Sequence, residues 1–176
     1  MKEYKLTTDQ LKDYCNKLKV GDKVLLSGIV YTARDAAHKR IFELINNKKP
    51  LPFDINGAVI YYAGPTPTPK GLPIGSCGPT TSKRMDPYTK TLTDMGLTAT
   101  IGKGERSTEV IDAIKKNNSV YLCAIGGAGA LAASCIKSLK VIAFEDLGCE
   151  SIKQLEFKDF PLIVGIDSSG GNIFER

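Results

Sequence analysis

Two threonines and two cations stand close together in the segment GPTTSKRMD, residues 78–86. The glycine and proline predict a turn, and Thr80 or Thr81 is expected to be the N-cap of a helix over residues 81–95. The free N–H groups and the dipole at a helix N-terminus favour a carboxylate or a phosphate. Arg84 would lie in the first turn, where a cation is unfavourable unless an anion joins it. The segment therefore predicts an anion-binding site, although capping threonines and solvent-exposed cations would explain the same residue types.

A second candidate cation, Arg34, stands where a predicted strand turns into a helix. Asp35 is expected to be the N-cap of that helix and to orient Arg34. His38 is the only histidine and lies in the first turns of the same helix. Its ordinary pKa suits general acid–base chemistry, but the helical position favours a positioning or capping contact.

Lys103 lies between two glycines in the segment IGKGERS. Glycine allows the backbone to approach a ligand closely, so Lys103 is a candidate for holding an anion. A solvated loop lysine is the alternative. Asp86, in RMDPYT, is expected to pair with the neighbouring cations Lys83 and Arg84.

The elements that must position these residues alternate between strands and helices. A helix over Thr8–Leu18 makes residues 1–19 a short helical lead. The expected strands are residues 21–34, 51–64, 98–102, 119–125 and 140–144, with two short pieces at Ile152–Phe157 and Leu162–Ile166; the expected helices after the lead are residues 35–49, 81–95, 107–116 and a Gly/Ala-rich segment before the strand at 140. Alternation implies parallel pairing and the strand-rich ends indicate antiparallel additions, so we expect an α/β fold with a mixed, partly parallel sheet.

Length and charge limit the classes of protein. A chain of 176 residues with 42% hydrophobic residues suits one domain, residues 1–176. The net charge of +5 is spread along the chain without a cluster of like charges, so no nucleic acid partner is expected. No stretch reaches the roughly 18 apolar residues of a membrane helix. We expect a cytoplasmic protein without membrane contact.

Five cysteines are widely spaced, and no CxxC motif occurs among them. With a single histidine, the sequence contains neither a structural zinc pattern nor a complete iron–sulfur pattern. We therefore expect reduced thiols and no metal ligands in this chain. A metal centre would need ligands from another chain.

Four segments in order, TARDAAHKR, GPTTSKRMD, GKGERS and AIGGAGALAA, resemble the beta subunit of class I fumarases and of the related L(+)-tartrate dehydratases. The resemblance runs from about Val20 to Phe174. It implies a swivelling β/β/α domain that closes over a [4Fe-4S] cluster. In that family three cysteines of the alpha subunit, or of an N-terminal domain, hold the cluster, so the resemblance implies that this chain binds none of it.

The resemblance also implies roles for single residues. The chain would act in a hydro-lyase that hydrates fumarate to L-malate, or in one that dehydrates L(+)-tartrate, and it would be active only in a hetero-oligomer with its alpha subunit. Thr80 is implied as the catalytic base, although Thr81 stays open for that role. The dicarboxylate substrate would be bound by Arg34, Arg84, Lys103 and Thr81, with Asp35, His38 and Asp86 in support. Two carboxylates need several cations, and guanidinium groups bind them through paired hydrogen bonds.

Two other functions fit parts of the sequence. Gly127, Gly129 and Ala132 match the dinucleotide-binding pattern G-x-G-x-x-A after a predicted strand. Too few residues follow them to complete a dinucleotide-binding fold, and close helix packing explains the small residues equally well. A non-catalytic partner domain is the other possibility, but the cations Arg34, Arg84 and Lys103 stand against it.

Overall fold

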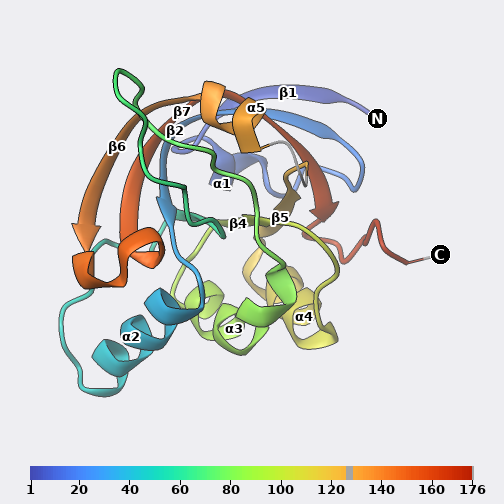
Figure 1. Ribbon diagram of the computed structural model, residues 1–176. Helices are drawn as coiled ribbons and strands as arrows, with labels where there is room; N and C mark the ends of the chain where they lie inside the picture. Colours follow the sequence, from blue (N-terminus) through green and yellow to red (C-terminus); the bar gives the residue numbers. More distant parts are fainter. Residues whose placement is uncertain (126–128, 176) are drawn as a thin grey trace.

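One mixed sheet of seven strands organises the computed structural model, which describes residues 1–125 and 129–175 (Figure 1). The strands are β1 (Glu3–Thr7), β2 (Lys23–Thr32), β3 (Val59–Tyr61), β4 (Ala99–Gly102), β5 (Val120–Cys123), β6 (Ile136–Ala143) and β7 (Ile152–Ile166). Their order in the sheet is β1-β2-β3-β4-β5-β7-β6. The predicted α/β fold with parallel and antiparallel pairs is confirmed.

Strand β7 closes the sheet into a partial barrel. Strands β2 to β5 are parallel neighbours, and β7 runs antiparallel to β5. The same β7 also pairs antiparallel with β2, from Lys23↔Ile163 to Tyr31↔Gln154. Strand β1 extends the sheet parallel to β2, and β6 extends it antiparallel to β7. A strand has two hydrogen-bonding edges, so β7 pairs with β2 along one edge and with β5 and β6 along the other.

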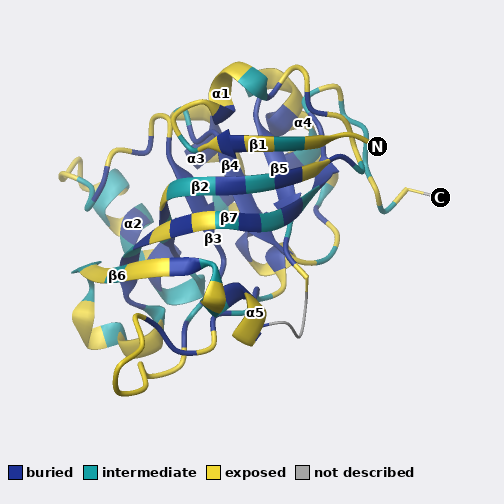
Figure 2. Ribbon diagram, turned by 90° about the horizontal axis from the view of Figure 1, so that it is seen from above, coloured by how far each residue is buried: buried dark blue, intermediate teal, exposed yellow. Residues whose placement is uncertain are grey.

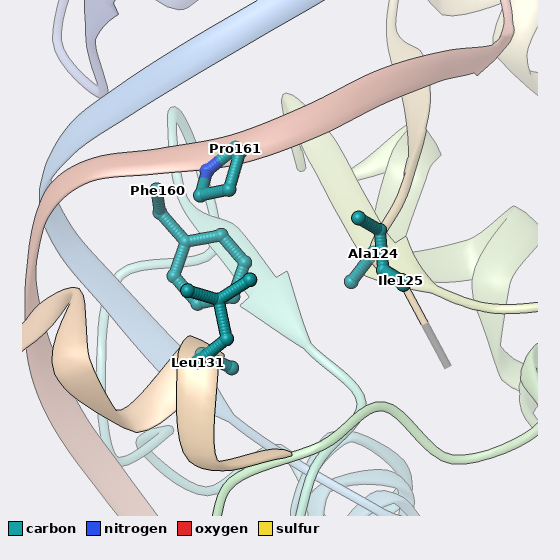
Figure 3. A pocket seen from close by; sticks show the side chains of 6 residues that line it. Ala124, Ile125, Leu131, Phe160 and Pro161 are labelled. Atoms are coloured by element: carbon teal, nitrogen blue, oxygen red, sulfur yellow. The ribbon is translucent and has the colours of Figure 1, made fainter. Parts of the chain in front are cut away.

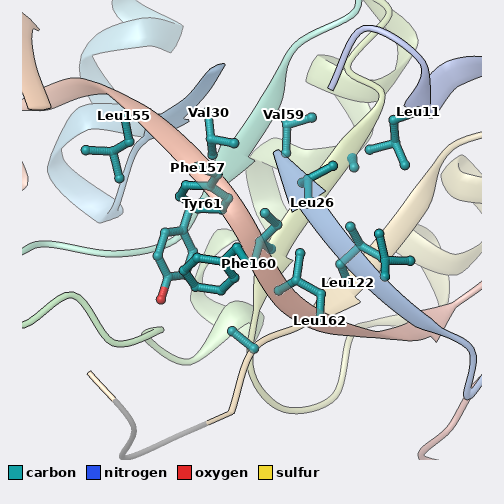
Figure 4. Packing of buried hydrophobic residues seen from close by; sticks show 14 of the residues in the cluster. Leu11, Leu26, Val30, Val59, Tyr61, Leu122, Leu155, Phe157, Phe160 and Leu162 are labelled. Atoms are coloured by element: carbon teal, nitrogen blue, oxygen red, sulfur yellow. The ribbon is translucent and has the colours of Figure 1, made fainter. Parts of the chain in front are cut away.

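Side chains on the inner strands are buried on both faces. In β3, Val59 and Tyr61 enter the core inside the barrel, whereas Ile60 enters the core under the helices. Successive residues of a strand point to opposite faces, so this apolar run fills both cores. Figure 4 shows Tyr61 with Phe157 and Phe160 of β7 in the barrel core. Figure 2 shows the contrast with the edge strand β6, which is largely exposed.

Helices cover the outer face of β3, β4 and β5 (Figure 1). The helical elements of residues 1–125 and 129–175 are α1 (Leu11–Tyr14), α2 (Asp35–Asn46), η1 (Ser82–Met85, a 3-10 turn), α3 (Asp86–Asp94), α4 (Thr108–Asn117), α5 (Gly129–Ser134) and η2 (Glu145–Glu150, 3-10). Helices α2, α3 and α4 lie on one side of the three inner strands, and the curved layer of β1, β2, β6 and β7 lies on the other. Within residues 1–125 and 129–175, every helix is too short or too polar to cross a bilayer.

Several predicted elements were wrong in their bounds. The strand predicted at 51–64 is only Val59–Tyr61, and the one predicted at 140–144 spans Ile136–Ala143. The N-terminal lead is mostly not helical: Glu3–Thr7 form β1, and the helix is a single turn, Leu11–Tyr14. The two short pieces near the C-terminus are one strand, Ile152–Ile166. Pairing with β2 explains the last two differences, because β2 supplies backbone partners to Glu3–Thr7 and also to Phe160 and Pro161, which lie between the two predicted pieces.

The predicted helix over residues 81–95 is divided into η1 and α3. Pro87 lies at the start of α3, where its fixed φ suits the first turn and its missing N–H needs no partner. Arg84 therefore precedes the α-helix, and Asp86 occupies the first turn, where the helix dipole favours a carboxylate. The cation thus lies just before the α-helix and not in its first turn.

Candidate functional site

The candidate residues gather at the carboxyl ends of three neighbouring parallel strands. Arg34 follows β2, and Lys103 follows β4. Between them, the backbone N–H of Thr80 donates to the carbonyl of Tyr62, the residue directly after β3, at 2.8 Å. Carboxyl ends of adjacent parallel strands meet at one edge of the sheet, which is where ligands bind in open α/β sheets. Two strand spacings, about 10 Å, separate the outer strands of this edge.

The chain from Pro79 to Ser82 lies across this edge. Pro79 forms an antiparallel bridge with Ala63, and Thr81 forms a parallel bridge with Lys103. The Ser82 N–H donates to the Lys103 carbonyl at 2.9 Å. The two segments predicted to bind an anion are therefore neighbours through their backbones.

Arg84 connects Thr80 with the start of α2. Its Nη2 donates to Thr80 Oγ1 at 2.5 Å and lies 3.4 Å from Asp35 Oδ2. The predicted pairing of Asp35 with Arg34 is wrong, because the Asp35 carboxylate pairs with Arg84 instead. The structure thus brings together Arg34, Asp35, Thr80 and Arg84, which are separated by up to 50 positions in the sequence.

The Arg34 guanidinium has few polar partners in the described part of the chain. Its buried Nε has no hydrogen-bond partner and lies 3.9 Å from Glu150 Oε1. A Cβ on Gly64 would lie 3.1 Å from Arg34 Nη1 and 2.9 Å from the Cys149 carbonyl. Glycine at position 64 therefore lets the backbone there approach the Arg34 guanidinium closely. A buried N–H without an acceptor is costly, which favours an oxygen ligand at this position.

The predicted helix caps differ from the observed ones. Arg34, not Asp35, is the N-cap of α2 and makes no side-chain cap. The Ala36 N–H instead donates to Glu150 Oε1 at 3.4 Å, so a residue from η2 takes the capping role. Thr81 is the N-cap residue of η1, but its side chain makes no cap hydrogen bond. Sequence reasoning missed Glu150 because it belongs to another element and carries no local motif.

His38 is buried beneath the site. Its Nδ1 lies 2.8 Å from the Arg34 carbonyl, which can only accept, so the neutral ring carries its proton on Nδ1. The ring stacks on Tyr88 at 5.3 Å and meets Tyr62 edge-on at 5.6 Å. Burial lowers the pKa of His38 to about 4. A neutral ring that holds the Arg34 backbone suits the positioning alternative better than acid–base work at neutral pH.

Asp86 does not pair with Lys83 or Arg84, and that prediction was wrong. Its Oδ1 accepts from Arg106 Nε at 2.7 Å, and its Oδ2 accepts from the Ser107 N–H at 2.7 Å. As the first residue of α3, Asp86 is buried, and its carboxylate meets Arg106 and Ser107 instead of the exposed Lys83 and Arg84. The segment GKGERS contributed to the family resemblance, but Arg106 within it was not predicted as a site residue. No local motif could have identified Arg106, because its partner Asp86 lies 20 positions away in the sequence.

The arrangement suits a small polyanion. Arg34, Arg84 and Lys103 project from one edge of the sheet, and Arg84 and Lys103 are exposed. Their positive charge is only partly balanced by Asp35 and by Glu150 at 3.9 Å from Arg34. Guanidinium groups bind carboxylates through two parallel hydrogen bonds, and the ammonium of lysine adds a compact charge.

The thiols are poorly placed to hold a metal. Cys15 and Cys77 are buried, and burial raises the pKa of Cys15 to about 11 and that of Cys77 to about 12. Metal binding requires the thiolate. In the described part of the chain, no three His, Cys, Asp or Glu residues come close enough to hold one ion. The residues of this chain therefore do not fit an iron–sulfur cluster by themselves.

A separate pocket near α5 has a different character (Figure 3). It is lined by apolar side chains, among them Leu131 of α5 and Phe160 and Pro161 of β7. A pocket without a charged or hydroxyl-bearing side chain cannot compensate the desolvation of a dicarboxylate. The chemistry of the site therefore lies at the sheet edge and not in this pocket.

The glycine-rich alternative lacks its expected topology. Gly127 lies outside the described residues, whereas Gly129 and Ala132 belong to α5. The next strand, β6, pairs antiparallel with β7, and in the described residues it forms no pair with β5. A dinucleotide-binding unit needs a parallel strand–helix–strand crossover. Close packing explains Gly129 directly, because a Cβ there would lie 2.3 Å from Ser76 Oγ.

The fold and the site together define an α/β domain that presents cations and a threonine hydroxyl at the carboxyl edge of a mixed sheet. Comparison with known families then identifies it. A family model described as "Fumarase C-terminus" matches residues 1–176. The chain belongs to this family, and the resemblance seen in the four motifs is confirmed.

The relatives have the names of hydro-lyases. "Fumarate hydratase 2" of Leishmania major is 39% identical over 176 residues, which are 99% of this chain and 31% of that protein. "Fumarate hydratase class I, anaerobic" of Escherichia coli is 42% identical over 159 residues, 89% of this chain and 29% of that protein. "Putative L(+)-tartrate dehydratase subunit beta" of Methanocaldococcus jannaschii is 40% identical over 178 residues, 98% of this chain and 89% of that protein. The chain thus spans less than a third of the length of the two fumarate hydratases.

Proposed function

We propose that this chain supplies the carboxylate-binding groups and the catalytic base of a hydro-lyase that interconverts fumarate and L-malate. The observation that carries the proposal is the meeting of Arg34, Thr80, Arg84 and Lys103 at one edge of the sheet. The chain would be the beta subunit of a hetero-oligomer in the cytoplasm, and it would swivel as one domain over the site of its partner. Its family membership and the subunit name of the tartrate dehydratase relative support this reading.

In the proposed reaction, a proton leaves the carbon next to one carboxylate while hydroxide leaves the neighbouring carbon. Thr80 would take the proton, and Thr81 is the other candidate for that role. A threonine hydroxyl is a weak base unless its alkoxide is stabilised, and Arg84 Nη2 at 2.5 Å from Thr80 Oγ1 is placed to do so. Arg34 and Lys103 would stabilise the charge that develops on the substrate carboxylate.

A [4Fe-4S] cluster is assigned to the partner alpha subunit. A cluster with an open iron would supply Lewis-acid chemistry there. The cysteines of this chain do not fit such a group, so the roles assigned above are limited to carboxylate binding and proton transfer by its own residues.

L(+)-tartrate is the second candidate substrate. The relative whose length this chain nearly spans, 89% of it, has a name that specifies L(+)-tartrate dehydratase. Tartrate has a hydroxyl on the carbon that loses its proton, so the same cations and base would serve. The two substrates would be distinguished by contacts to that one hydroxyl.

The test is turnover by the chain assembled with its alpha subunit under anaerobic conditions, followed by NMR with L-malate and with L(+)-tartrate. We expect the assembly to convert malate and the chain alone to convert nothing. Thr80→Val should lower kcat by at least about 100-fold, because it removes the base. The matched control is Thr91→Val, an exposed threonine of α3, which should retain full turnover. Near-full activity of Thr80→Val would remove Thr80 from the mechanism, and turnover of tartrate alone would change the substrate.

A further inference from the structure

The candidate site is divided between two segments whose relative position the backbone alone holds weakly. Thr80 and Arg84 come from the segment before α3, and Lys103 comes from the loop after β4. One bridge, which includes the hydrogen bond from the Ser82 N–H to the Lys103 carbonyl, joins their backbones. A substrate held from both sides needs that separation fixed, because small displacements of reacting groups are costly to rate.

A buried arginine lies directly beneath the two segments. The Arg106 side chain is 0% exposed. Its donors bind Asp86 Oδ1 at 2.7 Å, Thr100 Oγ1 at 3.1 Å, Tyr62 OH at 3.2 Å and Thr89 Oγ1 at 2.7 Å. Asp86 begins α3, and Arg106 follows Lys103 by three residues, so the ion pair ties the segment of Arg84 to the loop of Lys103.

Tyr121 of β5 links the same two segments through its hydroxyl and is the second tie between them. Its hydroxyl donates to the Gly104 carbonyl at 2.9 Å and therefore accepts from Ser82 Oγ, also at 2.9 Å. Gly104 follows Lys103, and Ser82 opens the turn that bears Arg84. The Arg106 guanidinium lies 4.8 Å from the centre of the Tyr121 ring, so the two ties also support each other.

Glycine at position 102 makes the second tie possible. A Cβ there would lie 1.9 Å from Ser82 Oγ and 2.9 Å from the Tyr62 ring. Even alanine would displace Ser82 from Tyr121. The close approach of the two segments is thus built into the sequence of the Lys103 loop.

The network is not explained by stability alone. Replacing a buried ion pair by apolar residues of similar volume is often neutral or stabilising in proteins. Arg106 also cannot serve the substrate directly, because its Nε, Nη1 and Nη2 atoms all hold buried protein acceptors. What the network does supply is a fixed geometry between segments that are 20 residues apart.

We propose that Arg106, Asp86 and Tyr121 are positioning residues that set the placement of Lys103 relative to Thr80 and Arg84. The catalytic consequence of this inference rests on the proposed function, whereas its structural part does not. The Tyr121 hydroxyl is the most informative group to remove, because Tyr121→Phe keeps the ring against Arg106 and leaves the ion pair intact.

The structural part is tested by amide hydrogen exchange in the full chain, followed residue by residue by NMR. The Ser82 N–H reports the contact between the segments, since it donates to the Lys103 carbonyl; the Thr98 N–H, which donates to the Ala58 carbonyl, reports the sheet. In Tyr121→Phe we expect Ser82 to exchange about tenfold faster while Thr98 stays within about twofold. Equal acceleration of both amides, or no change at Ser82, would overturn the proposal.

A matched control for this experiment is Thr93→Val. It removes another buried hydroxyl, which donates to the Thr89 carbonyl at 2.7 Å within α3 and makes no hydrogen bond to Ser82, Lys103 or Gly104 in the described residues. This variant should leave the ratio of the Ser82 and Thr98 exchange rates unchanged. A changed ratio would mean that any nearby loss of a hydrogen bond loosens the contact, which would contradict a specific role for Tyr121.

The catalytic part is tested by a double-mutant cycle in the assembled enzyme. Tyr121→Phe should lower kcat/KM about tenfold when Lys103 is present and less than about twofold in the Lys103→Met background, because a misplaced lysine and an absent one are then equivalent. The same factor in both backgrounds would overturn the positioning role. An assembly without hydro-lyase turnover would refute the proposed function instead, and the exchange ratio would still decide whether Tyr121 positions the loop.

Discussion

Two arginines in neighbouring segments show opposite uses of the same side chain. The Arg84 side chain is 48% exposed, donates to Thr80 and pairs with Asp35. The Arg106 side chain is 0% exposed, pairs with Asp86 and lies against the rings of Tyr62 and Tyr121. An exposed guanidinium with few partners is available to a ligand, whereas a buried one with all three nitrogens bound is part of the scaffold.

The comparison predicts which cation the fold depends on. A buried charge costs several kcal/mol of desolvation, so removing its partner leaves an uncompensated ion. An exposed ion pair contributes only about 0–1 kcal/mol, since water replaces the lost partner. Activity and stability should therefore separate between the two arginines.

The largest expected effect is that of Arg106→Met on folding. The substitution leaves the Asp86 carboxylate buried without its cation, and we expect the free energy of unfolding to fall by about 3–5 kcal/mol. Urea denaturation followed by circular dichroism measures this change. The matched control is Arg40→Met, which removes the exposed pair with Asp146 and should cost less than about 1 kcal/mol. Equal losses in the two variants would contradict the distinction between buried and exposed arginines.

A pH effect of intermediate size should come from His38, which lies between the two regions. Burial lowers the pKa of His38 from the ordinary 6.5 to about 4, and the charge of Arg106 acts in the same direction. The unfolded chain therefore takes up this proton at higher pH than the folded chain. The corresponding stability, about 3 kcal/mol, is fully present above pH 6.5 and is lost as the pH falls toward 4.

Thermal unfolding of His38→Phe measures this contribution. The variant keeps an aromatic ring against Tyr88 but cannot take up a proton. Between pH 6.5 and 4 the melting temperature of the wild type should fall more steeply than that of His38→Phe, because carboxylates contribute equally to both. Parallel curves would show that His38 is protonated alike in the folded and unfolded states.

The smallest expected effect on stability is that of Arg84→Met. The ion pair with Asp35 is exposed on both sides, so the free energy of unfolding should change by less than about 1 kcal/mol. In the assembled enzyme, however, the same variant should lose turnover strongly, since Thr80 loses its neighbouring cation. Denaturation and initial rates on one preparation give both quantities. A large loss of stability with retained turnover would place Arg84 in the scaffold with Arg106.

Local sequence signals predicted a large part of the fold. The hydrophobic runs predicted the inner strands, for example β4 and β5, because each run is buried on both faces. The helix α4 was predicted at residues 107–116, and in the structure Ser107 Oγ caps it by accepting from the Val110 N–H. Strand β1 and the continuous β7 were missed, since their backbone partners are distant in sequence and only pairing with β2 makes them strands.

By itself, the sequence determined the family, the inner strands and the candidate residues Arg34, Thr80, Arg84 and Lys103, because these depend on motifs and on local periodicity. The tertiary structure decided which charges meet. Asp35 pairs with Arg84, and Asp86 pairs with Arg106. Spacing along the chain had suggested Arg34 for Asp35, and Lys83 and Arg84 for Asp86. Burial is the physical reason. Which charges pair depends on the direction in which each side chain points and on how much hydration each charge loses on folding. Neither quantity follows from the distance between two residues along the chain.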